Sequence, residues 1–176
     1  GTNDAASISG VSTANLTETN AIQSASGQLT ITDVDSAATF VAQANVAGSN
    51  GYGNFSVDAT GHWTYTMNSA HDEFMAGHDY TDSFTVATAD GTSQVITVTM
   101  TGTNDAAVIT GTSTGSINES DVAQSVGGTL SATDVDSSAL FVAQSNVSGS
   151  NGYGKFSLTS AGVWTYAMNS AHNEFV

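Results

Sequence analysis

The sequence predicts an all-β protein built from tandem β-sandwiches, and two observations carry this prediction. Short segments that alternate apolar and polar residues recur at spacings of roughly 8–12 residues, separated by turn-forming Gly, Ser, Asn and Asp, which is the pattern of sandwich strands. The whole pattern then repeats: GTNDAA begins at Gly1 and again at Gly102, and about 46 of the 75 aligned positions are identical. A unit of about 100 residues has the length of a single domain.

Seven strands are expected in the first repeat, and most of them place large apolar side chains on alternate positions, which gives each strand one inward face. The expected strands cover residues 6–11, 27–32, 39–46, 54–58, 62–67, 82–88 and 94–101. In chain order, the inward groups are Leu29 and Ile31; Phe55 and Val57; Trp63, Tyr65 and Met67; Phe84 and Val86; and Ile96, Val98 and Met100. A single helical turn is expected over residues 70–77.

Seven short strands in a repeat of this length indicate an immunoglobulin-like or cadherin-like sandwich. The first repeat is complete over residues 1–101, whereas residues 102–176 align with only its first 75 positions and have no counterpart of its last two strands. Such a half-sandwich would expose open strand edges. We therefore expect either a continuation in a longer chain or completion between chains, by strand exchange or homo-oligomerisation.

The charge is strongly one-sided, with 16 acidic residues against the single basic residue Lys155 and a formal net charge of −15. Such a surface repels nucleic acid and anionic lipid and attracts cations. The alternative interpretation is a self-repelling surface that keeps the protein soluble. The chain contains no Cys, which excludes disulfides and thiolate metal sites. No apolar run is long enough to span a membrane, so direct membrane insertion is not expected.

Acidic side chains gather where the expected loops meet the boundary between repeats. Because successive strands run in opposite directions, loops one, three and five should lie beside the following repeat. The candidate ligands at that boundary are Glu18, Asp72, Glu73, Asn104, Asp105, Asp134 and Asp136. The equivalent candidates at the start of the first repeat are Asn3, Asp4, Asp33, Asp35 and Asp90.

Oxygen ligands drawn from several loops suit Ca²⁺, whereas Mg²⁺ demands tighter octahedral geometry and Zn²⁺ prefers His or Cys. The simpler explanation for any single Asp is that its side chain stabilises a turn. Glu73 is ranked above Asp72 as a ligand, because Glu174 keeps the acid in the second repeat while Asn173 replaces Asp72.

No catalytic constellation accompanies these acids, and we expect a protein that is not an enzyme. Acidic pairs can hydrolyse glycosides, but here they recur once per repeat at domain ends, which suits a joint better than a cleft. His71 and His172 have no Cys or Ser constellation beside them. The GSNGYG segments at residues 48–53 and 149–154 lack the Lys of a phosphate-binding loop and are predicted to be hairpin turns.

Several motifs resemble the VCBS repeat of giant adhesins and RTX-type proteins of Gram-negative bacteria. These motifs are GTNDA at the boundary, GTLSATDVD at residues 128–136, WTY at residues 63–65, DSFTV at residues 82–86 and ADG at residues 89–91. The family usually has Pro after NDA, where this sequence has Ala6 and Ala107. The resemblance implies an extracellular protein on the bacterial surface, exported by type I secretion.

The acidic residues are also similar to those of cadherin repeats, which bind calcium between repeats. Cadherins use a Glu after the first strand, an acidic group before the sixth strand, an Asn/Asp linker, an Asp-Xaa-Asp and a later Asp. Near-identical repeats without an obvious pocket favour a structural extender that contacts neighbouring repeats of the same protein, and the likeness implies that calcium stiffens it. The alternative is a module that itself binds carbohydrate or another copy.

Overall fold

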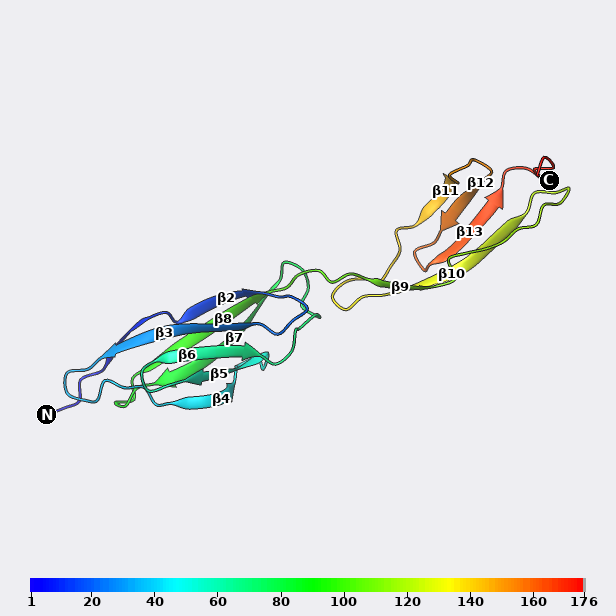
Figure 1. Cartoon of the computed structure of the whole chain (residues 1–176). Coiled ribbons are helices and arrows are strands. Elements are labelled where there is room, and N and C mark those ends of the chain that lie inside the picture. Colours follow the sequence, from blue (N-terminus) through cyan, green and yellow to red (C-terminus); the bar gives the residue numbers. More distant parts are fainter. Residues whose placement is uncertain (176) are drawn as a thin grey trace. The chain divides into compact units, whose positions relative to one another are not determined.

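The computed structural model describes residues 1–175, which fold into two compact units: Gly1–Asn104, and the residues from Asp105 onward (Figure 1). The described residues contain 13 strands and no helix. The predicted all-β class with a cadherin-like sandwich is confirmed. The two units are described separately below.

The larger sheet of the first unit has five antiparallel strands in the order β1-β3-β6-β5-β4. Its strands are β1 (Ser7–Gly10), β3 (Ser24–Thr32), β4 (Gln43–Ala47), β5 (Gly53–Val57) and β6 (His62–Met67). Strand β6 alternates strictly between exposed and buried residues, as the sequence predicts, with Trp63, Tyr65 and Met67 facing inward. Strand β4 is shorter than expected, because only Phe40 of the preceding residues forms a β-bridge, with Thr88.

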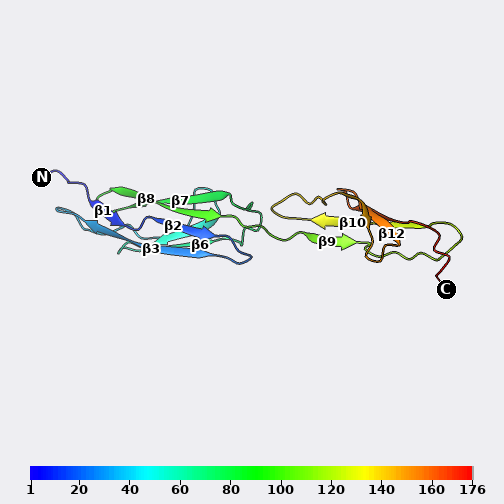
Figure 2. The ribbon, with the colours of Figure 1, turned by 90° about the horizontal axis from the view of Figure 1, so that it is seen from above.

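The smaller sheet of the first unit has three strands in the order β2-β8-β7. Its strands are β2 (Thr13–Thr17), β7 (Asp79–Ala87) and β8 (Ser93–Thr101). β7 and β8 form an antiparallel hairpin, and β2 runs parallel to β8. Figure 2 shows the two layers, with β3 and β6 in one and β7 and β8 in the other. The core fills the space between them.

The core depends on aromatic rings from the larger sheet packed against aliphatic side chains from β7 and β8. Phe55, Trp63, Tyr65, Ile96 and Val98 are completely buried. The Phe55 ring lies 4.6 Å from that of Tyr65 and stacks on that of Phe84 at 5.5 Å between ring centroids. The Trp63 indole nitrogen donates to the Val11 carbonyl at 2.7 Å, which satisfies the one polar group of this buried side chain.

The first predicted strand, residues 6–11, corresponds to β1, and a further strand that the sequence did not predict, β2, follows it in the other sheet. The change of sheet takes place at Gly10, whose φ of +100° favours glycine. A side chain there would also collide with the β3 backbone, since a Cβ would lie 2.4 Å from the Gln28 carbonyl oxygen. β2 was missed in the sequence because it forms through its pairing with β8, which lies far away in the chain.

The helical turn expected over residues 70–77 is wrong, because this segment consists of non-helical turns. His71 has a φ of 61°, which is incompatible with a right-handed helix. The segment is held instead by Phe74, which is buried and stacks on Tyr80 with 3.8 Å between ring centroids.

The second unit forms one five-stranded sheet in the order β11-β12-β13-β10-β9, matching the larger sheet of the first unit. Its strands are β9 (Val108–Gly111), β10 (Ser125–Thr133), β11 (Gln144–Ser148), β12 (Gly154–Leu158) and β13 (Val163–Met168). Residues 112–120 form no strand, although the aligned residues of the first unit include β2. The reason is that β2 pairs with β8, and the described residues of the second unit include no equivalent of β8.

Candidate metal centre

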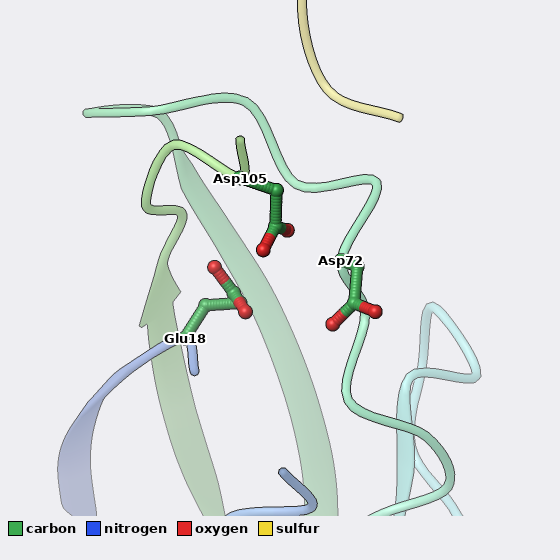
Figure 3. A group of neighbouring side chains, drawn as sticks. All are labelled: Glu18, Asp72 and Asp105. Carbon is green, nitrogen blue, oxygen red and sulfur yellow. The ribbon is translucent and has the colours of Figure 1, made fainter. Parts of the chain in front are cut away.

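Three carboxylates form a compact group around the C-terminal end of the first unit: Glu18, Asp72 and Asp105 (Figure 3). One oxygen from each lies within 4.8 Å of the others. Glu18 directly follows β2, Asp72 lies in the turns between β6 and β7, and Asp105 comes directly after Asn104, the last residue of the unit. Segments distant in the sequence therefore supply the group.

Glu18 is the most buried member, with 1% of its surface exposed. Its position is fixed by backbone pairing, because its N–H donates to the Thr101 carbonyl at 2.8 Å. One carboxylate oxygen, Oε2, accepts hydrogen bonds from the backbone N–H and the hydroxyl of Thr103, at 3.1 and 2.5 Å. The other oxygen, Oε1, is buried and has no hydrogen-bond partner. This carboxylate is held in place while one oxygen still lacks a donor.

Asp72 is half-buried, and its Oδ1 is likewise buried with no hydrogen-bond partner. A buried charged oxygen that accepts no hydrogen bond is costly, and bound cations are one way in which proteins compensate it. Hard carboxylate oxygens from separate loops suit Ca²⁺, with its flexible coordination by six to eight oxygens. The orphaned oxygens of Glu18 and Asp72 therefore fit a calcium ion.

Glu73, which the sequence ranked above Asp72, does not join this group. Its side chain is mostly exposed, and its Oε1 lies 2.7 Å from Nδ1 of His71. The hydrogen bond from His71 lowers the pKa of Glu73 below its ordinary value. The other ring nitrogen of His71, Nε2, lies 2.9 Å from the Tyr52 carbonyl oxygen. Glu73 thus contacts His71 and lies outside the group of three carboxylates.

A second arrangement of acids occurs at the start of each unit. In the second unit, Oδ1 of Asp134 accepts the backbone N–H groups of Asp136 and Ser137 at 3.2 and 2.8 Å. The N–H of Asp105 donates weakly, at 3.4 Å, to Oδ2 of Asp136, whose Oδ1 is buried with no hydrogen-bond partner. The first unit repeats the pattern with Asp33, Asp35 and Asp4, and there Oδ2 of Asp33 is the buried orphan.

The pKa values of the Asp134–Asp136 pair are displaced in opposite directions. Burial raises the pKa of Asp136, and its contacts with the neighbouring carboxylates of Asp134 and Asp105 raise it further. Burial also opposes ionisation of Asp134, but hydrogen bonds from Ser137 and Asp136 outweigh it and hold its pKa below the ordinary value. Crowding of negative charge at this position makes a positive ion favourable there.

The remaining candidates at the start of the first unit are engaged by the protein itself. Asn3 accepts a hydrogen bond from the hydroxyl of Ser36 at 2.8 Å. Asp90 accepts hydrogen bonds from the hydroxyl of Thr88, the N–H and hydroxyl of Thr92, and the N–H of Ala6. These bonds, the one from Thr88 foremost, hold the pKa of Asp90 far below its ordinary value. Its carboxylate ties the N-terminal segment to the β7–β8 turn.

Asp82, which begins the expected strand of residues 82–88, is an acid whose role the sequence did not reveal. It is completely buried and accepts hydrogen bonds from the N–H groups of Asn50, Tyr52 and Gly53 at 2.8, 3.1 and 3.1 Å. The signal was present in the sequence, because Asp82 alternates with Phe84 and Val86 and so shares their inward face. Burial of the Tyr65 side chain raises the pKa of Tyr65, and the neighbouring Asp82 carboxylate raises it further.

The family model of the bacterial cadherin-like domain matches residues 3–102. The chain belongs to this family. Membership in the bacterial cadherin-like family points to an adhesin-like repeat at the extracellular surface, and calcium binding is common among cadherin-like domains. A search of curated protein sequences gives no match. None of the described residues forms a helix long and apolar enough to cross a membrane.

Proposed function

We propose that this bacterial cadherin-like protein is a structural extender of a surface adhesin, and that calcium bound at the end of each repeat stiffens it. The observation that carries the proposal is the pair of buried oxygens without hydrogen bonds, Oε1 of Glu18 and Oδ1 of Asp72, within 4.8 Å of the Asp105 ligand atom. Glu18, Asp72 and Asp105 would hold the ion, together with Asn104 beside them in the chain.

The proposed stiffening follows from where the ligands lie in the chain. Asp105 is the first residue of the second unit, and Glu18 and Asp72 belong to the first unit. An ion that binds all three would restrict the backbone of the linker. Asp4, Asp33 and Asp35, the counterparts of Asp105, Asp134 and Asp136, would take part in a similar site at the start of the first unit. We propose that the role of the protein is structural and not enzymatic. We also propose that the protein is exported to the surface of a Gram-negative cell, as the VCBS resemblance implies.

Calcium titration by calorimetry tests the proposal on the full chain. Binding is expected with a Kd on the order of 10⁻⁴ to 10⁻³ M, as for other extracellular modules. Glu18→Gln removes the charge while keeping an acceptor for Thr103, and should weaken the boundary site at least tenfold. Glu73→Gln is the matched control, since it removes an exposed acid next to Asp72, and it should leave binding unchanged. Equal affinities in the parent and Glu18→Gln would refute the site.

A further inference from the structure

The chain enters and leaves the first unit through strands that pair with each other. β2 follows directly after β1, and β8 is the last strand before the second unit. These two strands are parallel, with paired positions that run from Thr13↔Thr97 to Thr17↔Thr101. Figure 1 shows the N-terminus at one end of this unit, while the chain leaves β8 at the opposite end. Tension between these two ends therefore pulls β2 and β8 in opposite directions along their own axes.

Strands that are pulled along their axes resist differently from strands that are peeled apart. The hydrogen bonds between parallel strands are evenly spaced along the pair. A pull along the axis loads all of these bonds at once, so they must break together. A pull across the axis opens the pair from one end, so the bonds break one after another. The orientation of the β2–β8 pair is thus the one that resists tension along the unit.

Further hydrogen bonds close both ends of the β2–β8 pair. At its start, the Thr97 N–H donates to the Ser12 carbonyl at 2.9 Å. At its other end, the Glu18 N–H donates to the Thr101 carbonyl at 2.8 Å. The hydroxyl of Thr103 then donates to Oε2 of Glu18 at 2.5 Å. The connection between the two segments therefore continues past the last residue of β8.

β8 is held on its other edge as well, where it pairs with β7 along its whole length. Past the strand, the Gly102 N–H donates to the His78 carbonyl and the Gly102 carbonyl accepts the N–H of Gly77, both at 2.9 Å. Residue 102 also packs tightly against this turn, since a Cβ there would lie 2.4 Å from the Met75 carbonyl oxygen. Extraction of β8 therefore requires the pairing on both of its edges to break.

β1 does not relieve this load. It lies in the larger sheet, where it pairs with β3 over residues 7–10. When tension pulls β1 away from β3, the tension passes along the chain to Ser12 and reaches β2, whose pairing with β8 is still intact. Release of β1 is thus a first step, and the β2–β8 pair sets the force at which the unit unfolds.

We propose that the β2–β8 pair, residues 13–17 and 97–101, is a mechanical clamp that lets the first unit bear tension along the chain without unfolding. The inference rests on the proposed extender role, because a segment that connects a cell to a distant target is stretched whenever the two are pulled apart. The clamp itself needs no calcium, since all of its hydrogen bonds join groups of the protein.

Single-molecule pulling on the full chain, in chelator, tests the proposal. The chain contains no Cys, so handles can be attached at engineered cysteines. A lengthwise pull between Thr2→Cys and Ala106→Cys stretches the first unit along β2 and β8. A transverse pull between Thr13→Cys and Ser93→Cys, at the same end of the two strands, peels them apart. At equal pulling speed, the lengthwise pull should need at least twice the force of the transverse pull.

Proline substitutions in β2 test the hydrogen bonds of the clamp. Residues two apart in a strand direct their backbone groups to the same side, and the backbone groups of Ser12 and Glu18 face β8. The N–H of Ala14 therefore faces β8, and Ala14→Pro should lower the lengthwise force by at least a third. The N–H of Asn15 faces the open edge of the sheet, where Pro is tolerated. Asn15→Pro is the matched control and should leave the force unchanged.

Val57→Ala separates the clamp from overall stability. Val57 is buried in β5, outside the clamp, so this variant should be less stable in urea and yet unfold at the parent's lengthwise force. Equal forces in the two pulling directions, an Ala14→Pro variant as strong as the parent, or a weakened Val57→Ala variant would each overturn the proposal. A failure of calcium binding would instead contradict the proposed stiffening and would leave these forces unchanged, because they are measured in chelator.

Discussion

The charge at position 72 should affect stability in opposite directions with and without calcium. Glu18, Asp72 and Asp105 place carboxylate oxygens within 4.8 Å of one another. At an effective dielectric constant of about 20, each such pair repels by about 3.5 kcal/mol or more before screening by solvent. Asp72→Asn removes two of the three pairs. In chelator, the variant should therefore be more stable than the parent, by roughly 1–3 kcal/mol once solvent screening is included.

With calcium the order should reverse. An ion that binds only the folded state stabilises it by about 2.7 kcal/mol at 100 times its Kd, which corresponds to roughly 10–20 °C in a domain of this size. The variant lacks one ligand charge and should lose most of this gain. Thermal unfolding followed by near-ultraviolet circular dichroism gives the melting temperatures of the parent and of Asp72→Asn, each with calcium and with chelator.

The control for this calcium-dependent reversal in the order of stability is Glu73→Gln. Its side chain is 62% exposed and pairs with His71, and an exposed ion pair contributes less than about 1 kcal/mol. Its melting temperature should follow that of the parent in both conditions. A destabilised Asp72→Asn variant in chelator, or a parent whose melting temperature ignores calcium, would show that the three carboxylates do not form the site described.

Three further predictions concern acids that the protein itself uses. Asp82→Asn should destabilise the first unit by about 2–4 kcal/mol in urea unfolding, because buried hydrogen bonds to a charged group are lost; Gly48→Ala should also destabilise it, while a neutral Gly48→Ala would refute the role of Asp82. Asp90 has a depressed pKa, so its contribution is complete above the unfolded pKa of about 3.9 and is lost as pH falls below it; Asp90→Asn should flatten the acid-side decline in melting temperature, and parallel curves would contradict this. The hydrogen bond from His172 to Glu174 raises the pKa of His172, so its contribution is complete below the unfolded pKa of about 6.5 and is lost as pH rises through the folded pKa; an NMR titration should show that Glu174→Gln lowers this pKa, and an unchanged value would contradict the pairing.

The strands could be predicted where the local sequence alone determines them. Trp63, Tyr65 and Met67 alternate over a strand whose two boundaries are correct, and the repeat of GTNDAA marks the region where the two units divide. β2 could not be predicted in this way, because Ala14 and Leu16 form a strand only by pairing with β8, some 80 residues further along the chain. The absence of a strand at residues 112–120, despite the alignment with β2, shows the same dependence on a distant partner.

The site was predictable as a set of loops but not in its details. Glu18, Asp72 and Asp105 were all candidates from the sequence, and the expected strand directions brought their loops to one end. The choice between Asp72 and Glu73 depends on the backbone at His71, whose φ of 61° turns the following residues. A single sequence does not reveal such a conformation at a non-glycine residue. The buried role of Asp82 was not predicted, although its alternation with Phe84 and Val86 indicated an inward position.

Diffraction from crystals of the chain grown with calcium tests the central claim most directly. Anomalous difference density should appear between the carboxylates of Glu18, Asp72 and Asp105, with Oε1 of Glu18 and Oδ1 of Asp72 at 2.3–2.6 Å from the ion, the usual calcium–oxygen distance. A map without density at this position at millimolar calcium, or an ion held by Glu73 in place of Asp72, would contradict the account.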